Sequence, residues 1–187
     1  MIVETERLIL RPWKESDAEA LYEYAKNPNV GPSAGWPIHT SVENSRQIIK
    51  DVLSAEYTYA ITLKEEDEAI GCIGLMIGKA SNFNLSGDEG EIGYWIGEPF
   101  WGNGYVPEAV KELMKYAFEN LKLTRLWCGY FEGNEKSKRV QEKCGFQYHH
   151  TNKDVKWELL NEIITEHVTC ISYDEWKNKC VHKVIER

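Results

Sequence analysis

The sequence EIGYWIGEPFWGNGYVPEA at residues 91–109 passes from an apolar strand through a glycine-rich loop into the clearest helix of the chain. The loop holds Gly102 and Gly104, which allow close approach of the backbone, and Pro107 suits a first helical turn, where a missing N–H costs nothing. Seven apolar side chains then recur every three or four residues: Val106, Val110, Leu113, Met114, Ala117, Phe118 and Leu121. Because the first helical amides lack intrahelical acceptors and the helix dipole attracts anions, the loop is predicted to bind a phosphate group.

Two nucleotide-binding motifs are excluded at this loop by their spacing. No lysine followed by a hydroxyl residue comes after Gly104, as a P-loop requires, and the third glycine of a dinucleotide-binding fold is absent. A tight strand-to-helix turn without any ligand remains the alternative for residues 101–106 taken alone.

Apolar runs and turn residues predict the other elements. Residues 79–90 have no apolar period and are interpreted as a hairpin loop, whereas the tail at 173–187 is either a helix packed on the sheet or an interface. The alternation of strands and helices predicts one α/β domain, residues 1–187, built on a mixed sheet. Strands are expected at residues 7–11, 57–63, 69–77, 91–96, 125–130, 146–150 and 163–171, and helices near 16–25, 48–53, 106–121 and 135–143.

Composition restricts the class of protein. The chain has 187 residues, of which 42% are hydrophobic, and no apolar run reaches the roughly 18 residues of a membrane span, so we expect a cytoplasmic protein without a signal peptide or a membrane partner. A net charge of −8 disfavours direct nucleic-acid binding. Five cysteines without a CxxC pair disfavour a disulfide framework and a metal site, so no metal is expected.

Three segments, in this order along the chain, carry a family resemblance: TERLILRP at residues 5–12, the stretch 91–109, and NEKSKRVQEKCGF at residues 134–146. They resemble the opening strand, the central strand with its coenzyme A pyrophosphate loop, and the second motif of the GNAT superfamily of N-acetyltransferases. Trp101 and Val106 depart from the usual superfamily residues, but a tryptophan in the first place is common in the RimJ/RimL-like branch. The resemblance implies the GNAT fold, a mixed, mostly antiparallel central sheet that is splayed at its central strands and has helices on both faces.

The resemblance also implies an activity. Acetyl-CoA is the expected co-substrate, with direct transfer to a primary amine in a ternary complex, and the protein N-terminal α-amino group is the acceptor typical of this branch. Two alternatives stay open: a small-molecule amine such as a polyamine, amino acid or antibiotic as acceptor, and a non-catalytic acyl-CoA-binding sensor. Both a monomer and a homodimer suit this fold.

Coenzyme contacts are implied along both motifs. Asn134 precedes a helix that it can cap, and the resemblance implies that it hydrogen-bonds the pantetheine arm. The residues expected to bind the coenzyme are Ile96, Trp101, Gly102, Asn103, Gly104, Tyr105, Val106, Asn134 and Ser137.

Two residues are candidates for catalysis. The attacking amine must be neutral. The resemblance implies a carboxylate at the start of the central strand that acts directly or through a water, so Glu91 is the candidate base; the alternative is a solvated loop-end charge like Asp88 and Glu89. The resemblance places Ser137 near the sulfur, where its hydroxyl would protonate the departing thiolate; the alternative is that it belongs to a plain capped helix.

Aromatic residues are candidates for the acceptor side. The proline-stiffened loop that holds Trp36 lies where the resemblance implies one wall of the substrate groove, so Trp36 is expected to cover the incoming amine, with Tyr94 as further lining. Tyr130 and Trp127 are weaker candidates, because large aromatic side chains at strand spacing more often belong to the core. The resemblance implies that a backbone N–H at residue 94 or 95 meets the oxyanion.

Overall fold

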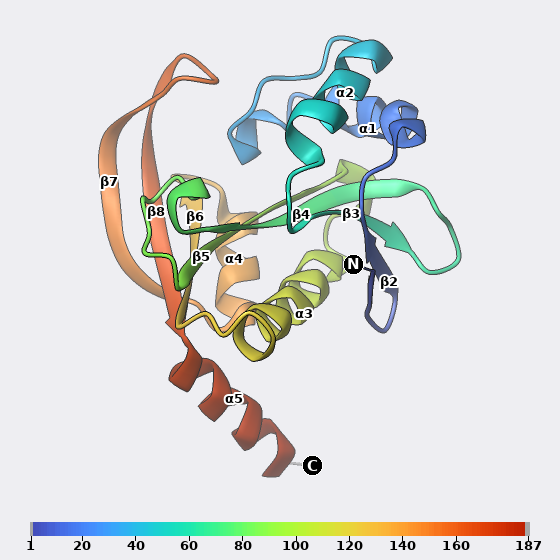
Figure 1. Cartoon of the computed structure of the whole chain (residues 1–187). Helices are drawn as coiled ribbons and strands as arrows, with labels where there is room; N and C mark the ends of the chain where they lie inside the picture. Colours follow the sequence, from blue (N-terminus) through green and yellow to red (C-terminus); the bar gives the residue numbers. More distant parts are fainter. Residues whose placement is uncertain (1, 186–187) are drawn as a thin grey trace.

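A computed structural model describes the backbone of residues 2–185 and the side chains of residues 2–179. Its strands form one sheet in the order β1-β2-β3-β4-β5-β6-β8-β7 (Figure 1). Every neighbouring pair is antiparallel except β5 and β6, which run parallel. The strands are β1 (Val3–Glu4), β2 (Leu8–Arg11), β3 (Thr58–Leu63), β4 (Ala69–Ile77), β5 (Glu89–Ile96), β6 (Arg125–Phe131), β7 (Gln147–Trp157) and β8 (Glu162–Ser172).

Helices cover both faces of the sheet, as the resemblance implies (Figure 1). Successive strand residues point to opposite faces, so in β3 Tyr59 and Ile61 pack with α3, while Ala60 packs with α1. The apolar stripe predicted for α3 is buried, with Leu113 and Phe118 at most 2% exposed. The helices are α1 (Ala18–Ala25), α2 (Val42–Ile48), α3 (Tyr105–Glu119), α4 (Glu135–Cys144) and α5 (Tyr173–Ile185).

Strands β5 and β6 separate after a short parallel ladder. Their last paired residues are Glu91 and Trp127, although both strands continue beyond this pair. Just past it, Cys128 Sγ donates to Ile92 O at 3.1 Å. The sheet is therefore splayed at its centre, and the gap opens toward the carboxyl ends of β5 and β6.

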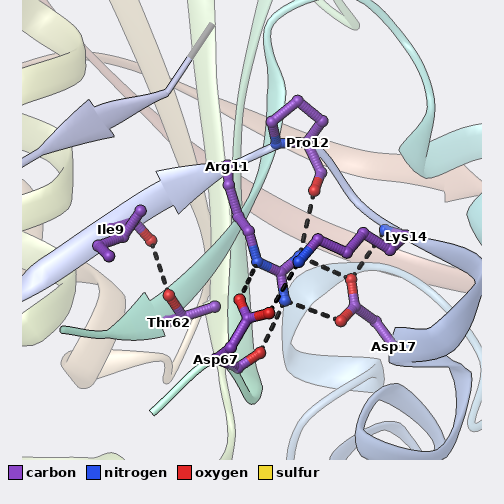
Figure 2. Close-up of polar contacts among 7 residues, drawn as sticks. All are labelled: Ile9, Arg11, Pro12, Lys14, Asp17, Thr62 and Asp67. Atoms are coloured by element: carbon purple, nitrogen blue, oxygen red, sulfur yellow. Dashed lines mark hydrogen bonds and ion pairs between the residues drawn. The ribbon is translucent and has the colours of Figure 1, made fainter. Parts of the chain in front are cut away.

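Arg11 connects three parts of the fold (Figure 2). At the end of β2 its buried guanidinium donates two hydrogen bonds of 2.8 Å to Asp17, which precedes α1. It also reaches the β3–β4 turn, where Asp67 Oδ1 and Asp67 O accept at 2.6 and 2.8 Å. Asp17 in turn accepts the backbone N–H of Lys14 at 2.8 Å. This network fixes the start of α1 relative to the sheet.

The two edge strands differ from the interior ones. β1 has only two residues. The long strand β7 slips out of register between Tyr148 and His150 and again between Asn152 and Val155, and Asp154 there has a positive φ of 55°. Such bulges bend and twist a strand locally.

The tail forms α5, whose first turn packs on α3 while the helix points away from the body of the fold (Figure 1). The Trp176 ring lies 5.2 Å from that of Phe118 and 6.0 Å from that of Tyr173. Residues 186 and 187, and the side chain of Cys180, lie outside the described residues. None of the helices described is long and apolar enough to cross a membrane.

The predicted elements are present, with three corrections. The strand expected at 146–150 continues to Trp157, because its bulges break the alternation of apolar and polar residues. The helix expected near 48–53 begins at Val42 with Ser41 as its N-cap, and Ile49–Leu53 is a π-helical continuation. The strand β1 was not predicted from the sequence, since a two-residue edge strand has no measurable period.

Candidate active site

A cavity of about 440 Å³ occupies the gap between β5 and β6. The glycine-rich loop and the start of α3 form one end of its lining, α4 forms a second wall, and residues 29–34 and Trp157 a third. Two hydrogen bonds connect these walls. Asn134 Nδ2, at the start of α4, donates to Ser33 O at 3.1 Å. Trp157 Nε1, at the end of β7, donates to Gly35 O at 2.7 Å. The splay thus becomes a cleft with walls on three sides.

The glycine-rich loop leaves open space at the start of α3. Gly102 and Gly104 have φ values of 81° and 78°, which L-residues rarely adopt, and a side chain added at Gly102 would meet no atom within 4 Å. Trp101 fastens the loop to β5, since its Nε1 donates to Ile96 O at 2.9 Å. The N–H groups of this turn are therefore held in an exposed concavity that suits phosphate oxygens.

Cations lie around this concavity. Lys136 Nζ stands 3.4 Å from the centre of the Trp101 ring, and Arg7 pairs with Glu108 and donates to Asn103 O at 2.9 Å. On α4, Lys136, Arg139 and Lys143 all line the cavity. Although the net charge of the chain is −8, positively charged side chains lie close together where an anion is expected to bind.

The strand β5 presents alternate backbone groups to the gap. The carbonyls of Ile92 and Ile96 accept hydrogen bonds from side chains that line the cavity, whereas Gly97 N–H donates to β4. Because the N–H and C=O of one residue lie on the same side of a strand and successive residues alternate, Tyr94 N–H faces the gap and Trp95 N–H faces β4. Of the two N–H groups predicted as oxyanion donors, only that of Tyr94 faces the gap.

Ser137 and Tyr94 meet across the cleft. Ser137 Oγ lies 2.9 Å from Tyr94 Oη and accepts a hydrogen bond from Gln141 Nε2 at 3.2 Å. Asn134 caps α4, as predicted, by accepting the Ser137 N–H at 3.1 Å. Burial holds the pKa of Tyr94 well above its usual value, so this phenol keeps its proton. Tyr94 therefore supports Ser137 rather than standing beside Trp36.

Glu91 is buried in the cavity wall, with 6% of its surface exposed. Its carboxylate accepts hydrogen bonds from Ser81 Oγ at 2.8 Å, from Asn82 N at 2.7 Å and from Asn82 Nδ2 at 3.1 Å. The interpretation of Glu91 as a solvated loop-end charge is therefore wrong. The loop at 79–90, which looked like a plain hairpin loop, supplies the donors that hold it.

A second carboxylate, Glu166, lines the same cavity. It lies on β8, is 7% exposed, and accepts one long hydrogen bond, from Asn152 Nδ2 at 3.5 Å. Burial raises the pKa of Glu166; the bond from Asn152 lowers it, and the negative charge of Glu91 raises it further.

Not every predicted site residue reaches the cavity. The side chain of Trp36 packs on Trp95 and His39, with ring centres 5.5 and 5.2 Å away, and does not line the cavity. Trp127 likewise belongs to a packed region against His149. Asn103 does not line the cavity either and bonds to its own loop. The other predicted coenzyme residues all line the cavity: Ile96, Trp101, Gly102, Gly104, Tyr105, Val106, Asn134 and Ser137.

Sequence reasoning missed Glu166 and the cationic side of α4, although both left a signal. Glu166 shares strand parity with buried Val168, so it is a charged residue on the inward face of an apolar strand. Lys136, Arg139 and Lys143 recur at helical spacing and so share a face. The contacts of Ser81 and Asn82 with Glu91 left no such signal.

The sequence matches the family described as Acetyltransferase (GNAT) domain over residues 7–147. This match includes β5, the glycine-rich loop, β6 and α4, which form most of the cavity lining. The chain therefore belongs to the GNAT family and is an N-acetyltransferase. The predicted RimJ/RimL-like membership is confirmed, and the enzymes of this family use acetyl-CoA.

Individual relatives agree with this assignment. An uncharacterized N-acetyltransferase of Bacillus licheniformis, p20, is 34% identical over 151 residues, covering 76% of this chain and 80% of p20. YdaF of Bacillus subtilis, provisionally named a ribosomal N-acetyltransferase, is 43% identical over 75 residues, covering 39% of this chain and 41% of YdaF. The crystal structure of a GNAT-family acetyltransferase from Bacillus anthracis is similar to this fold with a TM-score of 0.81 at 25% identity, covering 93% of this chain and 99% of that one.

Proposed function

We propose that the protein transfers the acetyl group of acetyl-CoA to the N-terminal α-amino group of a protein or peptide by direct attack in a ternary complex. One observation carries the proposal: a single cavity joins the open glycine loop, the Ser137–Tyr94 pair and a buried carboxylate, Glu91. These are an anion site, a proton donor and a proton acceptor, the parts that acyl transfer from a thioester to an amine requires.

The residues present fit coenzyme A. The amides after Gly102 and Gly104, with Lys136 and Arg139 beside them, suit the pyrophosphate, and the unpaired edge of β5 suits an extended arm that carries amide groups. Asn134 donates one N–H of its amide to Ser33 O, and the second N–H of that amide can contact the arm. When bound, acetyl-CoA supplies an acetyl group activated as a thioester.

The residues around the reacting carbon have different roles in the transfer. Tyr94 N–H donates to the carbonyl oxygen as negative charge develops on it. Ser137 Oγ–H, supported by Tyr94 and Gln141, donates a proton to the departing thiolate. Glu91 attracts the ammonium form of the acceptor into the cavity, where it has to lose a proton before it can attack.

A protein acceptor is supported by the relatives. The name of YdaF refers to a ribosomal substrate, and YdaF is 43% identical to this chain over the matched part. Trp36 would contribute to the acceptor side through Trp95, on which it packs and which lines the cavity.

The test combines calorimetric titration with acetyl-CoA and a thiol-release assay. The acceptors are lysine-free peptides with a free N-terminal serine or alanine, the same peptides with a blocked N-terminus as matched controls, and a set of polyamines and amino acids. Binding with release only from the free peptides supports the proposal. Release with small amines alone favours the small-molecule enzyme, binding without any release favours the acyl-CoA sensor, and absence of binding overturns the coenzyme site.

A further inference from the structure

The cavity contains two buried carboxylates where the proposed chemistry needs one. Glu91 on β5 and Glu166 on β8 both line it and are 6% and 7% exposed. They are close enough for the charge of Glu91 to act on Glu166. Burying two carboxylates near each other is unfavourable, since each loses hydration and repels the other. A cation bound between them would relieve both costs.

The two carboxylates differ in their hydrogen bonds. Glu91 accepts hydrogen bonds from a hydroxyl, a backbone N–H and a side-chain amide, all from Ser81 and Asn82. Glu166 accepts only the 3.5 Å contact from Asn152 to its Oε2 among the described residues. These donors hold the Glu91 carboxylate in place, whereas Glu166 Oε1 accepts no hydrogen bond from the described residues.

Gly129 gives room to that oxygen. A Cβ atom at Gly129 would stand 2.7 Å from Glu166 Oε1 and 3.1 Å from the Phe83 ring, so any larger residue would displace the carboxylate. The remaining titratable and charged groups that line the cavity are Tyr94, Tyr105, Cys128, Tyr130, Lys136, Arg139 and Lys143. None of these appears among the influences on the ionisation of Glu166, which come from burial, Asn152 and Glu91.

We propose that Glu166 is a second catalytic carboxylate, the one that accepts the proton of the acceptor ammonium, while Glu91 holds that ammonium in place. This inference rests on the proposed function and assigns its proton transfer to a particular atom. One N–H bond of the ammonium breaks and an O–H bond forms at Glu166. The freed lone pair then forms the N–C bond and the C–S bond breaks. Ser137 gives its hydroxyl proton to the thiolate and regains one from the second proton that the nitrogen loses, so the products are a neutral amide and the free thiol of coenzyme A, with the first proton on Glu166.

The raised pKa of Glu166 matches this role, because a base works best when its pKa approaches the working pH. The rate should therefore increase with pH as Glu166 loses its proton, at a pH above the usual carboxyl range. An acceptor that has to lose its proton to water instead would react only near the pKa of an α-amino group, about 8.

The experiment uses the full chain, acetyl-CoA and a lysine-free peptide with a free N-terminal serine. Glu166→Gln is expected to lower kcat/KM by about 100-fold near neutral pH, with the acetyl-CoA dissociation constant unchanged and most of the activity recovered at about pH 9, where the amine is already neutral. The matched control is Glu158→Gln, which removes the same charge from an exposed position of the β7–β8 hairpin.

A second readout does not depend on turnover. The carboxyl 13C signal of Glu166, assigned by its absence in Glu166→Gln, should titrate above the usual glutamate range and move toward that range in Glu91→Gln. An ordinary midpoint, or an equal loss of activity at all pH values, would overturn the role of Glu166. If wild-type protein acetylates the peptide and Glu166→Gln does so equally well, only this inference fails; if wild-type protein releases no thiol, the proposed function fails and this inference with it.

Discussion

Ser137 is the residue at which the chemistry can be separated from the fold. Its hydroxyl contacts Tyr94 and Gln141, while the Ser137 carbonyl also accepts from Tyr94 at 3.2 Å. Ser137→Ala is therefore expected to keep the fold and the affinity for acetyl-CoA but to lower kcat by about tenfold or more, through loss of proton donation. Single-turnover thiol release measures this, and a wild-type rate would leave Ser137 with a structural role only.

A substitution at Gly104 tests whether the glycine-rich loop binds the coenzyme. Gly104→Val would fill the open space before α3 and is expected to weaken acetyl-CoA binding by about tenfold to hundredfold, the effect of losing hydrogen bonds to a charged group. Gly133→Val is the matched control, since Gly133 has a φ of 85° and open surroundings but lies outside this loop. Calorimetry should show equal binding by the control and wild type; equal weakening in both variants would contradict the assignment.

Among the elements, the junction of β2, α1 and the β3–β4 turn depends on one buried ion pair. Asp17→Ala would leave Arg11 without its bidentate partner, and we expect a loss of about 3–5 kcal/mol in the free energy of unfolding. Asp67→Ala removes a carboxylate with 69% of its side chain exposed and should cost less than about 1 kcal/mol. Urea unfolding compares them, and equal losses would show that burial does not decide the cost.

The helices and strands differ in how well the sequence predicts them. The stripe from Val106 to Leu121 and the strands at 69–77 and 125–130 were predicted nearly to the residue, because their periods are uninterrupted. β7 was predicted too short because its bulges break the period. In the site, the glycine loop was identified by a local signal and Glu91 by the family resemblance. The contacts of Glu166 and Asn82 with the cavity depend on strand order, which a local pattern does not contain.

For the molecule as a whole, the distribution of charge matters more than its sum. The net charge is −8, yet Lys136, Arg139 and Lys143 line the cleft. The dissociation constant for acetyl-CoA should therefore rise several-fold between about 50 mM and about 500 mM salt, because ions screen these partly exposed cations. Calorimetry at each salt concentration measures the dissociation constant. In Arg139→Gln the dissociation constant is expected to depend less on salt than in wild type. A dissociation constant that is independent of salt would contradict a role for these cations in binding.

The two edges of the sheet have a further consequence, for how the protein behaves at high concentration. An open edge is a template on which another chain can add a strand, the first step of sheet-mediated aggregation. Here β1 offers two residues, and β7 is interrupted by two bulges and by Asp154 in a left-handed conformation. A second molecule therefore meets no straight row of unpaired N–H and C=O groups at either edge, and the irregularities that hid β7 from prediction also protect the folded protein from polymerising through its sheet.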